Sequence, residues 1–253
     1  MKYALVTGGS RGIGRAICVQ LAKDGYSVMV NYKSNHAAAE ETLRLIREVG
    51  GTAELLPFDV SDMDAVNAAM DKWETTHQDD FIDVLVNNAG ITKDDVLLGI
   101  EPNDWHAVVD ININGFYYVT RRVLSNMIIN HHGRIINMSS IAATHPFKGQ
   151  VNYSAAKAAI EGATRSLAVE VAPKQITVNA IAPGLIATEL LYNSAAEHDN
   201  LDIDIKKIVP MRRLGLPEEV AYLASFLASD KAAYISGQVI GINGMYGTFV
   251  EKL

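Results

Sequence analysis

Two side chains four residues apart could together move a proton. Tyr153 and Lys157 lie in a segment with a helical pattern, where this spacing puts both on the same face. A free tyrosine has a pKa of about 10, and a nearby ammonium lowers that pKa by favouring the phenolate. The pair predicts acid–base chemistry at the Tyr153 hydroxyl, although the same spacing also occurs in pairs that only decorate a helix surface.

A second candidate site is the glycine-rich turn near the start of the chain. An apolar run at 3–7 leads into Gly8, Gly12 and Gly14, and a helical pattern follows. Residues without Cβ let the backbone curl tightly and approach a phosphate, which the N–H groups of a helix amino terminus can bind. A plain tight turn would also use glycines, but their position after the first predicted strand favours a dinucleotide pyrophosphate site.

The elements that must hold these groups alternate between short apolar runs and segments with helical spacing. The runs that predict strands are 3–7, 27–31, 53–58, 83–87, 134–138, 177–181 and 238–242. The longer segments between them repeat apolar residues about once per turn, which is typical of helices. This alternation predicts one α/β domain over 1–253, a doubly wound Rossmann-like fold with a seven-stranded parallel sheet and helices on both faces. Functional residues are expected in the crevice at the carboxyl ends of the strands.

The region at about 184–216 breaks this alternation. It combines a weak helical pattern with four acidic residues between Glu197 and Asp204. We interpret the region as a mobile lid over the substrate. A solvated helical excursion without a gating role is the alternative.

The composition argues against several classes of protein. The formal net charge of −7 disfavours a nucleic-acid surface, because phosphate binding needs clustered Lys and Arg. No apolar stretch is long enough for a membrane span or a signal-peptide core, so we expect a cytoplasmic protein without a membrane partner. The lone Cys18 excludes an internal disulfide and predicts a buried thiol. The seven histidines form no ligand set with neighbouring Cys, Asp or Glu, so no metal site is expected.

The turn from Thr7 to Gly14, TGGSRGIG, resembles the signature of the short-chain dehydrogenases/reductases, and further motifs extend the similarity over nearly the whole chain. Within that family the sequence most resembles the 3-oxoacyl-[acyl-carrier-protein] reductases. The resemblance implies reduction of a 3-oxoacyl thioester, carried by acyl carrier protein or coenzyme A, to the 3-hydroxyacyl form in fatty-acid or related acyl-chain biosynthesis. It also implies a homotetramer assembled through two long helices.

The same resemblance implies a role for each reacting side chain. Tyr153 would donate a proton to the substrate oxygen, and Ser140, at the end of the fifth predicted strand, would bind that oxygen. Lys157 would bond the nicotinamide ribose and lower the pKa of Tyr153. Asn112, which the resemblance favours over Asn114, would hold a water that connects Lys157 to bulk solvent.

The predicted cofactor is NADPH/NADP+. NAD enzymes typically place an acid at the end of the second strand to bind the ribose 2′-hydroxyl, but this strand is followed by Lys33. Together with Arg11 of the glycine turn, Lys33 could bind a 2′-phosphate through charge-assisted hydrogen bonds. The alternative is that Lys33 only points to solvent.

The expected cofactor-binding residues come from the glycine turn, from the end of the second strand and from motifs that the resemblance matches. Asp59 would accept from the adenine amino group, Asn87 would stabilise the central sheet, and Ile186 and Thr188 would hold the nicotinamide carboxamide. The full set is Gly8, Ser10, Arg11, Gly12, Ile13, Gly14, Tyr32, Lys33, Asp59, Val60, Asn87, Ala89, Gly90, Tyr153, Lys157, Pro183, Gly184, Ile186 and Thr188.

Two departures from the reductases concern the carrier and the assembly. Residues 129–133 replace a basic cluster that often docks the acidic carrier, which leaves Arg121, Arg122 and Arg134 as nearby candidates. The segment 243–245 has one glycine where the family commonly has two, and residues 248–253 extend beyond it. The alternatives are a dehydrogenase for another ketone or alcohol (a specialised polyketide or aryl-polyene chain, a sugar or a steroid) and a cofactor-binding protein that has lost catalysis.

Overall fold

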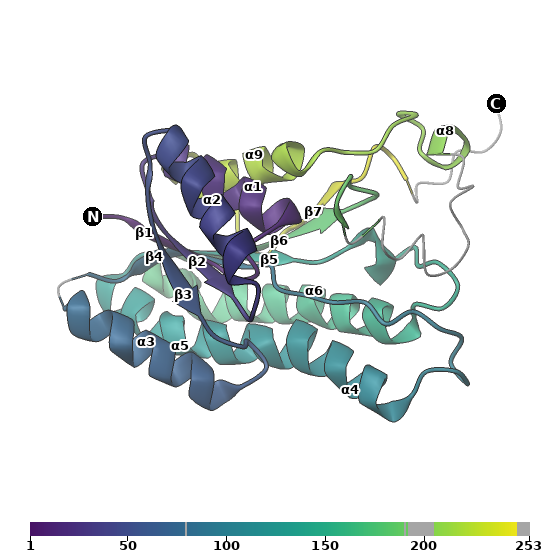
Figure 1. The fold of residues 1–253 in the computed structure, drawn as a ribbon, viewed down its shortest axis with the longest axis horizontal. Helices are drawn as coiled ribbons and strands as arrows, with labels where there is room; N and C mark the ends of the chain where they lie inside the picture. Colours follow the sequence, from purple (N-terminus) through teal and green to yellow (C-terminus); the bar gives the residue numbers. More distant parts are fainter. Residues whose placement is uncertain (79, 190, 192–204, 247–253) are drawn as a thin grey trace.

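The computed structural model describes residues 1–78, 80–189, 191 and 205–246 (Figure 1). These residues contain one seven-stranded parallel sheet in the order β3-β2-β1-β4-β5-β6-β7. The strands are β1 (Tyr3–Val6), β2 (Ser27–Tyr32), β3 (Thr52–Pro57), β4 (Ile82–Asn87), β5 (Gly133–Met138), β6 (Ile176–Pro183) and β7 (Val239–Ile242).

The sheet is covered by helices that follow the strands in turn. The described α-helices are α1 (Gly12–Lys23), α2 (His36–Glu48), α3 (Met63–Thr76), α4 (Pro102–Val109), α5 (Gly115–Asn130), α6 (Val151–Val171), α8 (Ile205–Ile208) and α9 (Pro217–Ala228). Shorter turns are the π-helix η1 (Asp110–Asn114) and the 3-10 helices η2 (Ile141–Ala143), η3 (Ala172–Lys174) and η4 (Asp230–Ala232). In this part of the chain each helix is too short or too polar to cross a lipid bilayer.

Alternation of side chains along the strands builds a core on each face of the sheet. In β1, Ala4 and Val6 pack in the cluster with α1, α2 and α9, whereas Tyr3 and Leu5 pack in the cluster with α3, α5 and α6. Figure 1 shows these two helix layers on opposite sides of the sheet. Parallel strands buried on both faces have nearly continuous apolar sequences, which explains why the predicted strands agree with the observed ones. Cys18 is buried in α1, as predicted.

The strand order reverses beside β1. This strand pairs with β2 on one side and with β4 on the other, and Val6 at its end lies opposite both Val30 and Val86. In such a sheet the loops after the two central strands leave toward opposite faces and open a crevice at the carboxyl ends. The glycine turn follows β1 and residues 88–90 follow β4, so both lie at this crevice.

Part of the predicted lid at about 184–216 lies outside the described residues. Residues 190 and 192–204, which include the acidic run from Glu197 to Asp204, are the part of the lid that lies outside the described residues. The carboxyl-terminal residues 248–253, which do not belong to the lid, also lie outside them. The two ends of the region lie side by side, because Ile186 and Gly215 form a parallel bridge. The gating role stays a prediction.

Candidate active site

The turn after β1 has a conformation that favours glycine. Gly8 and Gly12 have φ angles of 63° and 54°, and a Cβ at Gly14 would lie 2.3 Å from the Gly8 carbonyl oxygen. Among the described residues, no side chain caps the amino terminus of α1. Gly12, Ile13 and Gly14 form its first turn and line a cavity, so its N–H groups are available to a phosphate.

This cavity has a volume of about 940 Å³ and connects the glycine turn with the predicted reacting side chains. Each predicted cofactor residue except Asn87 lines it, and so do Ser140, Tyr153 and Lys157. The structure therefore brings the reacting groups and the glycine turn to one site. In the described ranges, His, Cys, Asp and Glu form no group of three or more that could hold a metal ion.

Asn87 does not line this cavity but lines a second, smaller one beside it, and its place among the cofactor contacts stays a prediction. Its Nδ2 donates to Thr120 Oγ1 and Asn137 Oδ1, each at 2.9 Å, and ties β4 to α5 and β5. The neighbouring Asn88, which the sequence reasoning did not single out, does line the cavity. Asn88 Nδ2 donates to the Thr7 carbonyl at 2.9 Å and joins the loops after β1 and β4. Its signal was the second asparagine of the run Asn87-Asn88-Ala89-Gly90, directly after the fourth predicted strand.

Two cations that line the cavity already have carboxylate partners. Lys33 Nζ lies 2.5 Å from Asp59 Oδ2, and Arg11 Nη1 lies 3.5 Å from Glu189 Oε2. Partial burial acts to raise the pKa of Asp59, but hydrogen bonds from Lys33 and Ser61 hold it below its usual value. Lys33 does not simply point to solvent, and a 2′-phosphate there would compete with Asp59 for the ammonium.

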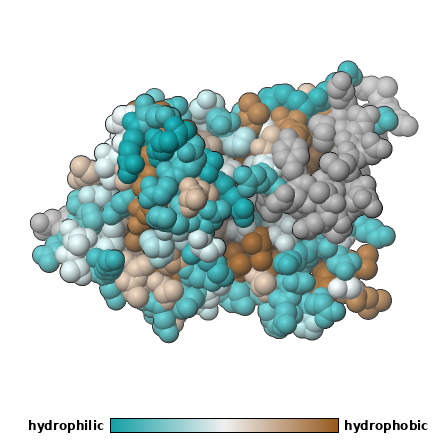
Figure 2. All heavy atoms as spheres, in the orientation of Figure 1, coloured by the Kyte–Doolittle hydropathy of each residue, from teal (hydrophilic) through white to brown (hydrophobic). Residues whose placement is uncertain are grey.

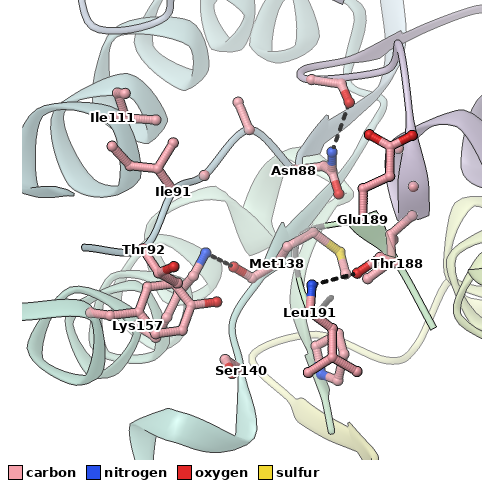
Figure 3. Close-up of a pocket in the computed structure, with 18 of the residues that line it drawn as sticks. Asn88, Ile91, Thr92, Ile111, Met138, Ser140, Lys157, Thr188, Glu189 and Leu191 are labelled. Carbon is pink, nitrogen blue, oxygen red and sulfur yellow. Dashed lines mark hydrogen bonds between the residues drawn. The ribbon is translucent and has the colours of Figure 1, made fainter. Parts of the chain in front are cut away.

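Lys157 is held at the reacting end by the last residue of β5. Its Nζ donates to the Met138 carbonyl oxygen at 2.8 Å (Figure 3). The side chain is buried, and burial lowers the pKa of its ammonium to about 8. Nζ also lies 5.5 Å from the centroid of the Tyr153 ring. The four-residue spacing on α6 thus places both groups together, as predicted.

Tyr153 differs from the sequence-based prediction in its pKa. Burial raises the pKa of its hydroxyl to about 12, the hydrogen bond with Ser140 acts in the lowering direction, and the charge of Asp94 adds to the rise. The prediction that Lys157 lowers this pKa is wrong for this structure. The physical reason is that burial of the phenol outweighs the other effects, while the Lys157 ammonium donates to Met138 and is itself disfavoured by burial. Tyr153 is therefore a protonated acid near neutral pH.

Asn112 lies in η1, the π-helical turn between α4 and α5. Its Nδ2 donates to the carbonyls of Ile91 at 3.0 Å and Val108 at 2.9 Å, whereas its buried Oδ1 has no hydrogen-bond partner within the described part of the chain. Asn112 and Lys157 line a second cavity of about 10 Å³, close to the smallest size that holds a water. Asn114 donates instead to Asp110 Oδ1 at 2.7 Å.

Gly90 makes room between these groups. A Cβ at this position would lie 2.6 Å from Asn112 Oδ1 and 3.4 Å from Lys157 Nζ. A buried acceptor that lacks a protein partner, close to a buried ammonium, is a common setting for an ordered water.

Besides the bond from Lys157 to Met138, a second contact between the end of β5 and α6 was not predicted from the sequence. Ser139 Oγ donates to Glu161 Oε1 at 2.9 Å and to the Lys157 carbonyl at 3.4 Å. Ser139 follows Met138 and precedes Ser140, so this contact fixes the end of β5 against the helix that carries Lys157. Only the fold brings a serine at 139 next to a glutamate at 161.

Comparison with known proteins finds oxidoreductases that match this chain over nearly its whole length. A family model described as "Enoyl-(Acyl carrier protein) reductase" matches residues 8–246. A 3-oxoacyl-[acyl-carrier-protein] reductase from Synechocystis is 45% identical over 246 residues, which cover 96% of each chain. A protein of the same name from Staphylococcus aureus is 41% identical over 96% of this chain and 97% of its own.

One solved structure shows the same fold with a cofactor. A gluconate 5-dehydrogenase from Burkholderia cenocepacia, in complex with NADP and tartrate, matches with a TM-score of 0.90 and 33% identity. The match covers 98% of this chain and 96% of that chain. This similarity supports a nicotinamide dinucleotide as the occupant of the glycine-lined part of the cavity.

Proposed function

Because the chain belongs to the short-chain dehydrogenase/reductase family, we propose that it reduces 3-oxoacyl thioesters to 3-hydroxyacyl thioesters with NADPH. The observation that carries the proposal is that the hydroxyls of Ser140 and Tyr153 and the buried Lys157 line one cavity with the glycine turn. The curated relatives that carry the name of this activity support the substrate class. The pathway is then fatty-acid or related acyl-chain biosynthesis.

The two hydroxyls suit the reduction of a carbonyl rather than of a carbon–carbon double bond. A reduced nicotinamide, when bound, supplies a hydride to the carbonyl carbon. Tyr153 then gives its proton to the oxygen on which negative charge develops, and Ser140 donates a hydrogen bond to the same oxygen. Because the pKa of Tyr153 is about 12, its proton is in place at neutral pH before the reaction begins.

Lys157 and Asn112 return the proton to Tyr153. With a pKa of about 8, the Lys157 ammonium gives up a proton more readily than an ordinary lysine does. Asn112 Oδ1 would hold a water in the small cavity that both residues line, and this water would reprotonate Lys157. Lys157 would also bond the nicotinamide ribose.

The glycine turn fits the pyrophosphate of a dinucleotide, because residues without Cβ let a phosphate come close to the backbone. Within the described residues no side chain caps the amino terminus of α1, so its N–H groups are available to that phosphate. Arg11 and Lys33 support NADPH over NADH, because each could bind the 2′-phosphate. Dissociation constants for the two cofactors test this preference. Equal values would remove it.

The acyl group is proposed to be bound to acyl carrier protein or to coenzyme A. Of the three arginines considered for carrier docking, Arg134 has a side chain only 5% exposed and hydrogen-bonds the carbonyls of Gly133 and Gln175. Arg122 pairs with acidic residues of α3. Burial and pairing thus argue against these two, and Arg121, which is exposed, remains the candidate. A cytoplasmic homotetramer completes the proposal, and light scattering tests the assembly.

Oxidation of NADPH with acetoacetyl thioesters, compared with a panel of free ketones and keto sugar acids, tests the substrate class. Faster turnover of thioesters is expected. The second candidate is a dehydrogenase of free hydroxy acids, which the similarity to the gluconate 5-dehydrogenase favours. Higher kcat/KM on a free keto acid would support that candidate, and tight NADPH binding without any turnover would support a non-catalytic protein.

A further inference from the structure

One part of the cavity wall consists of apolar side chains that stay exposed to solvent and have no role in the proposed reaction. Phe147, Val96 and Leu191 line the cavity, and the residues Phe147 and Val96 remain 39% and 47% exposed. Figure 2 shows hydrophobic residues at the tip of the loop that leads into α4, the loop to which Val96 belongs. Large exposed apolar groups in a cavity wall indicate a surface that a ligand covers.

Phe147 lies between the two proposed reacting residues along the chain. Its loop begins with η2, whose amino end Ser140 caps, and ends at α6, whose first turn contains Tyr153. The Phe147 N–H donates to Gln150 Oε1 at 3.1 Å, and Gln150 Nε2 donates to Asp94 Oδ2 at 3.0 Å. These bonds fix the loop against the segment after β4. The ring is therefore presented to the cavity by an anchored backbone.

A second ring supports the first from the far end of the chain. Tyr246 stacks on Phe147, with ring centroids 5.6 Å apart and an interplanar angle of 21°. The turn that carries Tyr246 follows β7 and is held by Asn243, whose Nδ2 donates to the Tyr246 carbonyl at 2.9 Å. The Tyr246 N–H returns a bond to the Asn243 carbonyl at 3.0 Å. Two nearly parallel rings are thus held in place by the loop before α6 and the turn after β7.

We propose that Phe147, which stacks on Tyr246 and lines the cavity together with Val96 and Leu191, forms the subsite for the acyl chain and selects chains that carry a flat π-bonded group, aryl or conjugated, near the 3-oxo carbon. This inference rests on the proposed function. A flat group gains a stacking interaction with Phe147 beyond the apolar area it buries, whereas a saturated chain gains only the area. Because Tyr246 already orders the ring, binding needs little further ordering of the protein.

The test compares three thioesters of coenzyme A: acetoacetyl, 3-oxo-5-phenylpentanoyl and 3-oxo-5-cyclohexylpentanoyl. The last two have similar bulk, but only one carries a flat ring. The wild-type protein is expected to favour phenyl over cyclohexyl by about two- to tenfold in kcat/KM, the range that one aromatic pair contributes. Phe147→Leu should bring the ratio of phenyl to cyclohexyl kcat/KM to about one, because the change keeps an apolar wall but removes the ring.

Two further variants separate stacking from general damage. Tyr246→Leu should reduce the ratio of phenyl to cyclohexyl kcat/KM, because it loosens the ring that faces the ligand. Tyr222→Leu removes an exposed tyrosine on α9 and should alter none of the three rates. Equal wild-type rates on the phenyl and cyclohexyl substrates, or a preference that survives Phe147→Leu, would overturn the subsite alone. If the wild-type protein reduces no thioester at all, the proposed function fails and the subsite fails with it.

Discussion

Replacing Lys157 with methionine should stabilise the folded protein at neutral pH while removing activity. Burial lowers the pKa of this lysine from its usual 10.5 to about 8, so at pH 7 the folded state holds an ammonium that water would solvate better. That difference costs the folded state about 3 kcal/mol at pH 7. Methionine has a similar shape without the charge. The lost hydrogen bond to the Met138 carbonyl offsets about 1 kcal/mol, which leaves a net gain of about 2 kcal/mol.

The pH dependence identifies the cause of this gain. Between pH 8 and 10.5 the unfolded chain binds more protons at residue 157 than the folded protein does, so the stability of the wild-type protein rises with pH in that window. At pH 9.5 the cost of burying Lys157 falls to about 1.4 kcal/mol. The difference in unfolding free energy between the variant and the wild type should therefore shrink by about 2 kcal/mol between pH 7 and pH 9.5.

Urea unfolding at pH 7, 8 and 9.5, followed by circular dichroism, measures this difference. Lys72→Met, at an exposed position on α3, serves as the control and should show no comparable change with pH. If the difference in unfolding free energy between Lys157→Met and the wild type stays constant from pH 7 to pH 9.5, the reasoning is refuted. That result would show that the pKa of Lys157 is not lowered in the folded protein.

Three further predictions test separate parts of the molecule. Lys33→Ala should weaken NADPH binding about tenfold and NADH binding less, by fluorescence titration, because it removes a cation from the 2′-phosphate side; equal losses for both cofactors would contradict the assignment. Gly14→Ala should lower the free energy of unfolding by about 2 kcal/mol, because its Cβ would lie 2.3 Å from a carbonyl oxygen of the turn. Gly162→Ala serves as the control because Gly162 has open space around it on α6, and it should raise the free energy of unfolding by up to about 1 kcal/mol. Thermal unfolding measures both variants, and a Gly14→Ala variant as stable as Gly162→Ala would contradict the predicted collision. Ser139→Ala and Glu161→Leu should each lower kcat about tenfold at unchanged KM, Glu161→Gln should restore it, and an unchanged kcat would exclude a positioning role.

The parts of the structure that the sequence predicts well depend on local patterns. Strands buried on both faces leave apolar runs such as 27–31, and β2 occupies Ser27–Tyr32. The glycine turn is equally readable, because a positive φ at Gly8 and a collision at Gly14 leave little alternative to glycine. The spacing of Tyr153 and Lys157 on one helix predicts their proximity for the same reason.

What the sequence does not predict depends on contacts between distant segments. The pKa of Tyr153 is set by how deeply the fold buries its hydroxyl, which the spacing to Lys157 does not reveal. The pairing of Lys33 with Asp59 joins the ends of two adjacent strands, and the stacking of Phe147 on Tyr246 joins the middle of the chain to its last described residue. Each of these follows from the order of the sheet, which hydrophobic periodicity alone does not fix.

The most direct test of the site is Tyr153→Phe, which removes only the hydroxyl that we propose as the proton donor. NADPH should bind with an unchanged dissociation constant, while kcat on an acetoacetyl thioester falls by about 100- to 10,000-fold, the usual contribution of a positioned general acid. A variant that binds NADPH normally and keeps most of the wild-type rate would show that the proton comes from elsewhere and would contradict the account.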